Sequence, residues 1–170
     1  MPEAETVQRA RRDKRQGKAP STQSGEFVRR EIEHIREGKH GARSTKQAIA
    51  IGLSEARRAG VDLAPPKSGS ASQKTRKNAS RAHALGHGAV PRRKSSAKRV
   101  KASTDALKRE PRAAASSAAL SSQARSAANR RSPLARSLSA QKAARTRGAA
   151  GRASAARKAA PTRAAHERHS

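Results

Sequence analysis

Large apolar side chains are concentrated in one short stretch of this 170-residue chain. Nine of them fall within residues 27–63, whereas residues 111–170 contain only three, all leucines. A chain forms a packed core only where it has enough apolar surface to remove from water. The sequence therefore predicts one small folded module and no separate core in the C-terminal part of the chain.

The charge is distributed in the opposite way. The net charge is +28 at pH 7; residues 1–65 hold 14 basic and 9 acidic residues, and residues 66–170 hold 26 and 3. Strong like charge with little apolar surface favours disorder. We therefore expect a small all-α helical hairpin followed by a long basic tail that is largely disordered or conditionally helical. The expected segments are a flexible basic arm (1–20), the helical hairpin module (21–65), a basic linker (66–102) and an Ala/Arg/Lys/Ser-rich tail (103–170).

The first helix of the predicted hairpin is indicated by the segment SGEFVRREIEHIREGK. Val28, Ile32 and Ile35 follow one another at the spacing of a single helical face. Ser24 is a suitable cap for the start of this helix, and Gly38 is a suitable residue for its end.

The second helix has the clearest start signal in the chain. Ser44 followed three residues later by Gln47 matches a capping box. Gly60, followed by Val61, matches a left-handed helix terminator. Gly52 lies in the middle of the apolar face, where it lowers helix propensity by about 1 kcal/mol but lets a neighbouring backbone approach closely.

A module of about 40 residues lies at the size below which domains need disulfides, metals or partners to be stable. The chain has no cysteine. We therefore expect the hairpin to be marginally stable and to gain stability from homodimerisation or from its ligand.

The sequence shows no convincing catalytic constellation. The one cluster that resembles acid/base chemistry, Glu31, Glu33, Glu37 and His34, falls on a short helix that we expect to be exposed, where solvated ion pairs are the usual role. We therefore expect no enzyme activity, no catalytic residue and no cofactor.

Metal binding is also not expected. Without cysteine there is no thiolate ligand, and His83 and His87 provide two ligands where a zinc site requires three or four.

No apolar run approaches the roughly 20 residues needed to cross a bilayer, and the N-terminal residues lack the apolar stretch of a signal peptide. We expect a cytoplasmic, nucleoid-located protein that does not bind membranes.

Binding to a polyanion follows from the charge, because each phosphate neutralised by Lys or Arg releases counterions. Phe27 is the only aromatic residue, which disfavours readers of single strands that stack bases on aromatic rings. Sequence-tolerant binding to duplex DNA is therefore the leading hypothesis, as in nucleoid-associated or histone-like proteins. The predicted contact residues are Arg43, Lys46, Arg57, Arg58, Arg92, Arg93, Lys94, Lys98, Arg99, Lys101, Arg130, Arg131, Arg145 and Arg147.

Two other functions fit the same composition. Basic extensions bind RNA by the same electrostatics, so the chain could be an RNA- or ribosome-associated protein. Alternatively, the hairpin could bind a protein partner while the basic tail binds a polyanion, which would make the chain an adaptor. A helix-turn-helix reader is less favoured, because two helices are fewer than the usual three.

The segment IREGKHGARSTKQAIAIGLSEARRAGV resembles a family of uncharacterised small basic bacterial proteins. The shared pattern is the Ser-x-Lys-Gln-Ala-Ile-Ala-Ile-Gly-Leu-Ser motif, here Ser44 to Ser54, and with its flanks it covers about residues 20–66. The Ala/Lys/Arg-rich tail is similar in composition to linker-histone tails and bacterial histone-like proteins. The resemblance implies a DNA-binding protein and provides no functional residues to carry over.

Overall fold

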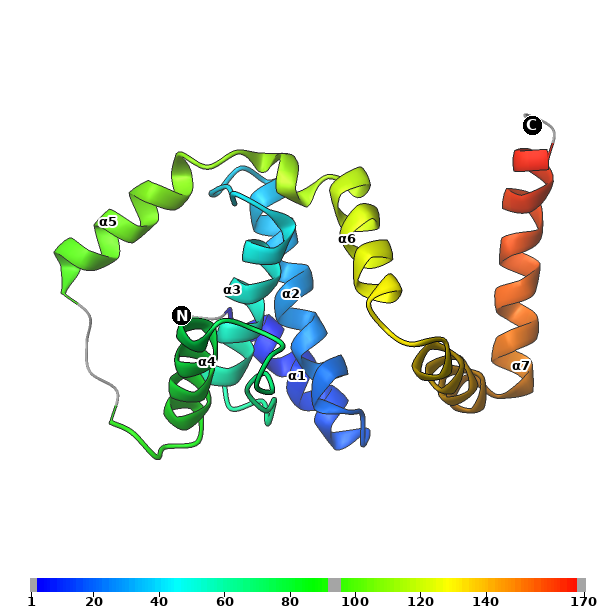
Figure 1. The fold of residues 1–170 in the computed structure, drawn as a ribbon, viewed down its shortest axis with the longest axis horizontal. Helices are drawn as coiled ribbons and strands as arrows, with labels where there is room; N and C mark the ends of the chain where they lie inside the picture. The colour runs from blue at the N-terminus through cyan, green and yellow to red at the C-terminus, as the bar shows by residue number, and fades with distance from the viewer. Residues whose placement is uncertain (1–2, 92–95, 168–170) are drawn as a thin grey trace. The chain divides into compact units, whose positions relative to one another are not determined.

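The computed structural model describes residues 3–91 and 96–167, and the described residues are largely helical (Figure 1). They form seven α-helices and one short 3-10 helix: α1 (Ala4–Arg15), α2 (Pro20–Arg36), α3 (Thr45–Arg58), α4 (Gln73–Gly86), α5 (Ala97–Lys108), η1 (Arg112–Ala115), α6 (Ser117–Asn129) and α7 (Pro133–Glu167). The chain divides into two compact units, Met1–Gln123 and Ala124–Ser170.

Helices α2 and α3 are the two helices that the sequence predicts, and they pack against each other. Ser44 accepts the backbone N–H of Gln47 at 3.2 Å, which confirms the cap at the start of α3. At the end of α3, Gly60 has a φ of +87° and the N–H of Val61 donates to the carbonyl of Ala56, as the terminator predicts. Helix α2 begins earlier than expected, because Pro20 occupies its first turn and Ser24 lies inside the helix.

Gly52 is the point of closest approach between α2 and α3. A Cβ atom built on Gly52 would lie 2.7 Å from the Cα of Val28 and 3.0 Å from the carbonyl oxygen of Phe27. These distances are too short for any side chain, so the backbones touch only because residue 52 has none. The expected close approach is confirmed.

The expected flexible arm is instead the helix α1, which packs on α2. Ala10 is buried in one apolar cluster with Phe27, Ala56 and Val61, and Val7 packs against this cluster. Large apolar residues do not mark this helix in the sequence, because its buried residues, such as Ala10 and Thr6, are small or polar.

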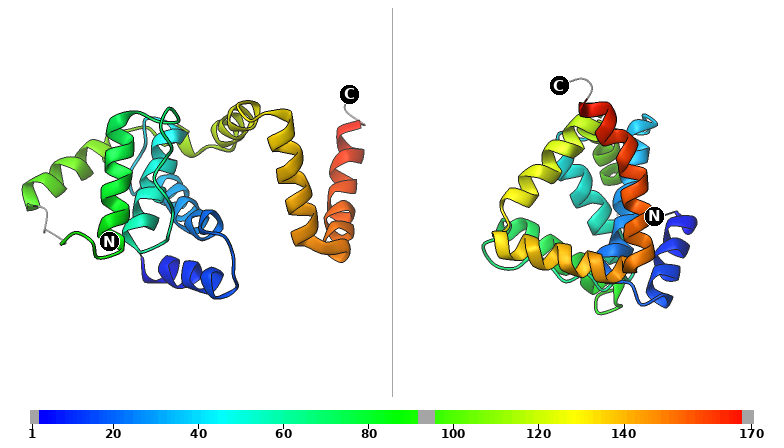
Figure 2. Two further views of the ribbon diagram at one scale, coloured as in Figure 1. Left: turned by 60° about the horizontal axis from the view of Figure 1, so that its bottom comes forward. Right: turned by 90° about the vertical axis from the view of Figure 1, so that its right-hand side faces the viewer.

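Helix α4 and η1 extend the core beyond the hairpin. In both Figure 1 and Figure 2, α4 lies beside α3, where Ala79 and Ala82 are buried. Ala114 and Ala115 of η1 complete a second apolar cluster with Ile32 and Ile35. The hairpin is therefore covered by segments of its own chain. Homodimerisation was expected because an isolated hairpin is small, and this reason no longer holds.

The prediction of a hairpin with a disordered tail is wrong, because the chain is an all-α protein with helices along most of residues 97–167. Alanine supplies helix propensity in these segments, and serine caps their starts: Ser96, Ser116 and Ser132 each accept a backbone N–H three residues on. Helix α7 is kinked at Gly148, where φ is +64° and ψ is 178°. Disorder was expected because these segments have few large apolar residues, whereas serine caps stabilise the helices locally.

Among the described residues, no helix is both long enough and apolar enough to span a bilayer.

Candidate functional site

Most of the predicted contact residues have exposed side chains. Arg43 and Lys46 lie at the start of α3, Arg58 at its end, and the others lie on or between α5, α6 and α7. This exposed group comprises Arg43, Lys46, Arg58, Lys98, Arg99, Lys101, Arg130, Arg131, Arg145 and Arg147. Arg92, Arg93 and Lys94 lie outside the described residues.

Arg57 does not belong to this exposed group. Its side chain is buried (6% exposed), and its guanidinium donates hydrogen bonds to the carbonyls of Leu53, Leu63 and Ala64 at 3.4, 3.0 and 3.2 Å. Desolvation lowers the pKa of Arg57 from its ordinary value. Arg57 therefore links the chain after α3 to the helix by hydrogen bonds, and its buried side chain is not exposed for contact with a phosphate.

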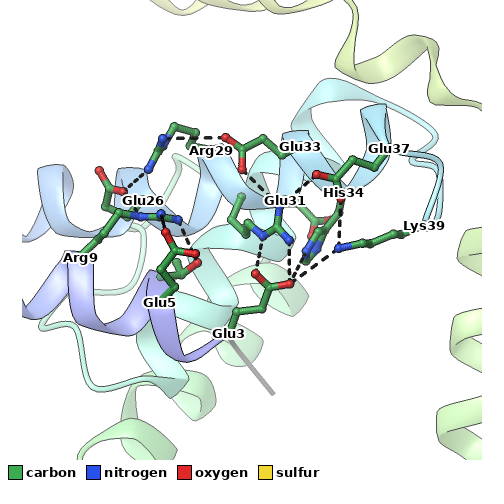
Figure 3. A network of polar contacts seen from close by, with 12 residues as sticks. Glu3, Glu5, Arg9, Glu26, Arg29, Glu31, Glu33, His34, Glu37 and Lys39 are labelled. Atoms are coloured by element: carbon green, nitrogen blue, oxygen red, sulfur yellow. Dashed lines mark hydrogen bonds and ion pairs between the residues drawn. The ribbon is translucent and has the colours of Figure 1, made fainter.

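Three arginines of α1 and α2, Arg9, Arg29 and Arg30, pair with nearby carboxylates (Figure 3). Arg30 pairs with Glu3, Glu33 and Glu37 at 2.5, 3.3 and 3.2 Å. These contacts raise the pKa of Arg30, and they hold the pKa of Glu3 at about 2, chiefly through the hydrogen bond from Arg30. This carboxylate network joins the start of α1 to α2.

A second part of the network joins α1 and α2 further along. Arg9 pairs with Glu26 at 3.0 Å and also with Glu5, and Arg29 pairs with Glu26 at 2.6 Å. Arg9, Arg29 and Arg30 are thus neutralised within the fold, whereas Arg11, Arg12 and Arg15 of α1 are exposed.

Residues 111–167 differ, because they contain twelve Lys or Arg residues and one acidic residue, Glu167. Ion pairing within this segment cannot neutralise its charge. In the preceding α5, Lys101 pairs with Asp105 at 2.8 Å, while Lys98 and Arg99 are exposed. Uncompensated positive charge therefore extends over all of residues 66–167: residues 66–110 hold 13 basic and 2 acidic residues, and residues 111–167 hold 12 and 1.

The cations of α7 do not share one face. At 3.6 residues per turn, Arg136 and Arg147 lie within about 20° of each other around the helix axis, and Arg145 lies on the opposite side. This arrangement places positive charge around the helix and does not form a single row of cationic side chains.

Glu31 is the exception to the expected exposed acid/base cluster. Its side chain is 2% exposed, and desolvation raises its pKa to about 7. His40 Nε2 lies 3.6 Å from Glu31 Oε2, and a ring nitrogen of His34, one turn along α2, lies within 4.8 Å of a ligand atom of each. The signal for this burial was the position of Glu31 within the apolar arc of the helix.

A second acid and histidine cluster lies at the end of α4. His83 contacts Asp62 Oδ1 at 3.0 Å, and His87 lies 3.9 Å from the same oxygen. The hydrogen bond from His83 lowers the pKa of Asp62. Gly86 makes this arrangement possible, because a Cβ there would lie 1.8 Å from the carbonyl oxygen of Arg57.

The folded part of the chain is thus an all-α unit that carries a basic helical extension. The model of a family of unknown function, DUF6496, matches residues 3–68, which include α1, α2, α3 and the Ser44 to Ser54 motif. Comparison with curated proteins and with solved structures finds no match.

Proposed function

We propose that this protein binds the phosphate backbone of duplex DNA without sequence preference, and that α5, α6 and α7 make most of the contacts. The packed helices α1–α4 serve as the folded base from which these basic helices extend. This is a histone-like mode of binding, driven by electrostatics.

The observation that carries this proposal is the segregation of charge. The carboxylates of α1 and α2 are used within the fold, whereas residues 111–167 have twelve cations and a single carboxylate. A polyanion is the partner that compensates such a segment, and it also relieves the repulsion between neighbouring arginines.

The side chains of the basic helices favour duplex DNA over single strands. They contain no aromatic residue on which bases could stack. Their cations face in several directions, which suits backbone contact and the entry of arginine into a narrow minor groove.

Two matched sets of substitutions test where the DNA binds. One full-length variant carries Arg136→Gln, Arg145→Gln and Arg147→Gln on α7. The control variant carries Arg11→Gln, Arg12→Gln and Arg15→Gln on α1, whose side chains are also exposed. Both variants lose three positive charges.

The measured quantity is the slope of log affinity for a mixed-sequence duplex against log salt concentration. Each lost phosphate contact flattens this slope by about 0.9, so the α7 variant should differ from the native protein by about 2.7. The control variant should keep nearly the native slope. Equal effects of the two sets would show that only net charge matters and would contradict the assignment to α7.

A further inference from the structure

We propose that Glu31, His34 and His40 form a binding site for a divalent transition-metal cation of the zinc class. Glu31 and His34 lie one turn apart on α2, and His40 lies in the loop that follows the helix. One ligand atom from each residue lies within 4.8 Å of the other two. The site is independent of the proposed binding to DNA.

The tautomer of His40 is fixed by its backbone contact. His40 Nδ1 lies 3.0 Å from the carbonyl oxygen of Gly41. A carbonyl oxygen only accepts, so Nδ1 carries the hydrogen and the neutral ring presents a lone pair at Nε2. This hydrogen bond to a backbone carbonyl is the usual device that orients a metal-binding histidine.

That lone pair faces a carboxylate. His40 Nε2 and Glu31 Oε2 are 3.6 Å apart, so two acceptors point at each other unless a proton or a cation lies between them. In a tetrahedral site with bonds of about 2.0 Å, two ligand atoms are separated by about 3.3 Å. The observed separation is close to that value.

Glu31 also has an unsatisfied oxygen. Its Oε1 is buried and has no hydrogen-bond partner among the described residues. Burying a carboxylate without a hydrogen-bond partner costs desolvation free energy. Glu31 is nevertheless enclosed by the packed helices. A cation bound by this carboxylate would remove that cost.

Charged groups of both signs lie beside His34. Glu3 Oε1 lies 3.0 Å from His34 Nε2 and is also bonded by Arg30, while Lys39 lies 3.8 Å from the same oxygen (Figure 3). Glu3 is therefore a further carboxylate in contact with a residue of the proposed site. Two imidazoles and a carboxylate form a known zinc donor set, whereas Mg²⁺ and Ca²⁺ prefer oxygen ligands throughout.

Asp62, His83 and His87 form a second group of three possible ligands and provide the internal control. This group is more open to solvent, with the side chain of Asp62 72% exposed. Both of its short contacts use one carboxylate oxygen.

The test titrates chelator-treated, full-length protein with Zn²⁺ in competition with a chromophoric chelator. The variants are Glu31→Gln and His40→Gln, with His83→Gln as the matched control, and far-UV circular dichroism checks that each variant is folded. The native protein should bind one Zn²⁺ with micromolar or tighter affinity. Glu31→Gln and His40→Gln should each weaken binding at least tenfold, and His83→Gln should leave it nearly unchanged.

A second readout keeps the test decisive if one variant folds poorly. Long-range ¹H–¹⁵N spectra of the histidine rings should show that Zn²⁺ perturbs Nε2 of His40 and one ring nitrogen of His34 and leaves the rings of His83 and His87 unaffected. Failure of the native protein to bind Zn²⁺, or loss of binding only in His83→Gln, would overturn the proposal.

Discussion

The crossing of α2 and α3 at Gly52 makes a quantitative prediction, because the same substitution at two glycines should have opposite effects. In Gly52→Ala, the new Cβ meets the Cα of Val28 at 2.7 Å and the nitrogen of Val28 at 2.9 Å. In Gly25→Ala, on α2, nothing lies within 4 Å of the new Cβ. Gly25 therefore reports helix propensity alone, and Gly52 reports propensity together with packing.

The magnitudes follow from these contacts. Replacing a glycine inside a helix by alanine stabilises the protein by about 0.5–1 kcal/mol, and this is the expected gain for Gly25→Ala. Overpacking costs about 1–3 kcal/mol and is most costly when the atoms that must move belong to the backbone. Gly52→Ala should therefore lose about 1–2 kcal/mol after its gain in propensity.

Differential scanning calorimetry on full-length variants measures both effects, because the cooperative transition reports the packed helices. The two variants should move the melting temperature in opposite directions by several degrees each. Far-UV circular dichroism should show native helix content at 20 °C in both. A Gly52→Ala protein as stable as the native one would refute the close approach of the two backbones.

Three further substitutions test individual contacts. Arg57→Ala should destabilise the packed unit by about 2 kcal/mol, because three carbonyls lose a charged donor, and the exposed Lys46→Ala should change stability little in the same chemical unfolding experiment. Thr45→Val should cost about 1 kcal/mol, because Thr45 Oγ1 donates to the carbonyl of Ala114 at 2.7 Å; hydrogen exchange should quicken in η1, and unchanged protection there would count against this contact. The pKa of Asp62 is lowered in the folded state, so its ionised carboxylate stabilises the protein above pH ~4, and this contribution is lost as the pH falls through the pKa of the folded state. The difference in melting temperature between the native protein and Asp62→Asn should therefore shrink toward pH ~3. A difference that stays constant with pH would contradict this prediction.

The sequence predicted the local signals of the central hairpin well, because each depends on neighbouring residues. The cap at Ser44 and Gln47, the terminator at Gly60 and the role of Gly52 all follow from local geometry and were confirmed. The two terminators lie in the left-handed region, with Gly38 at a φ of +79°. In each case the local backbone conformation or a contact with the backbone favours the residue type found there.

What packs onto the hairpin could not be predicted from the same signals. Helix α4 and η1 contribute buried alanines, which look identical in sequence to the alanines of the exposed helices. Thr45 and Ala114 are joined by a hydrogen bond although 69 residues separate them, and no local pattern indicates such a pairing.

The positions of the candidate site residues also depend on packing between distant segments, which local sequence patterns do not reveal. Arg57 was predicted to contact phosphates because it lies on the second helix of the hairpin, whereas its burial depends on the path of the chain after α3. The grouping of Asp62 with His83 depends on the packing of α3 against α4. The excess of charge in residues 111–167 is different, because it is a property of composition and could be read directly.

The most direct test of the central claim is a salt titration of the full-length protein with a mixed-sequence duplex and with a structured RNA of equal phosphate number. Binding to DNA through about ten phosphates predicts a log–log slope of about −9, with DNA bound at least as tightly as RNA. A shallow slope, or displacement of the duplex by RNA at well below equimolar phosphate, would contradict the proposed function.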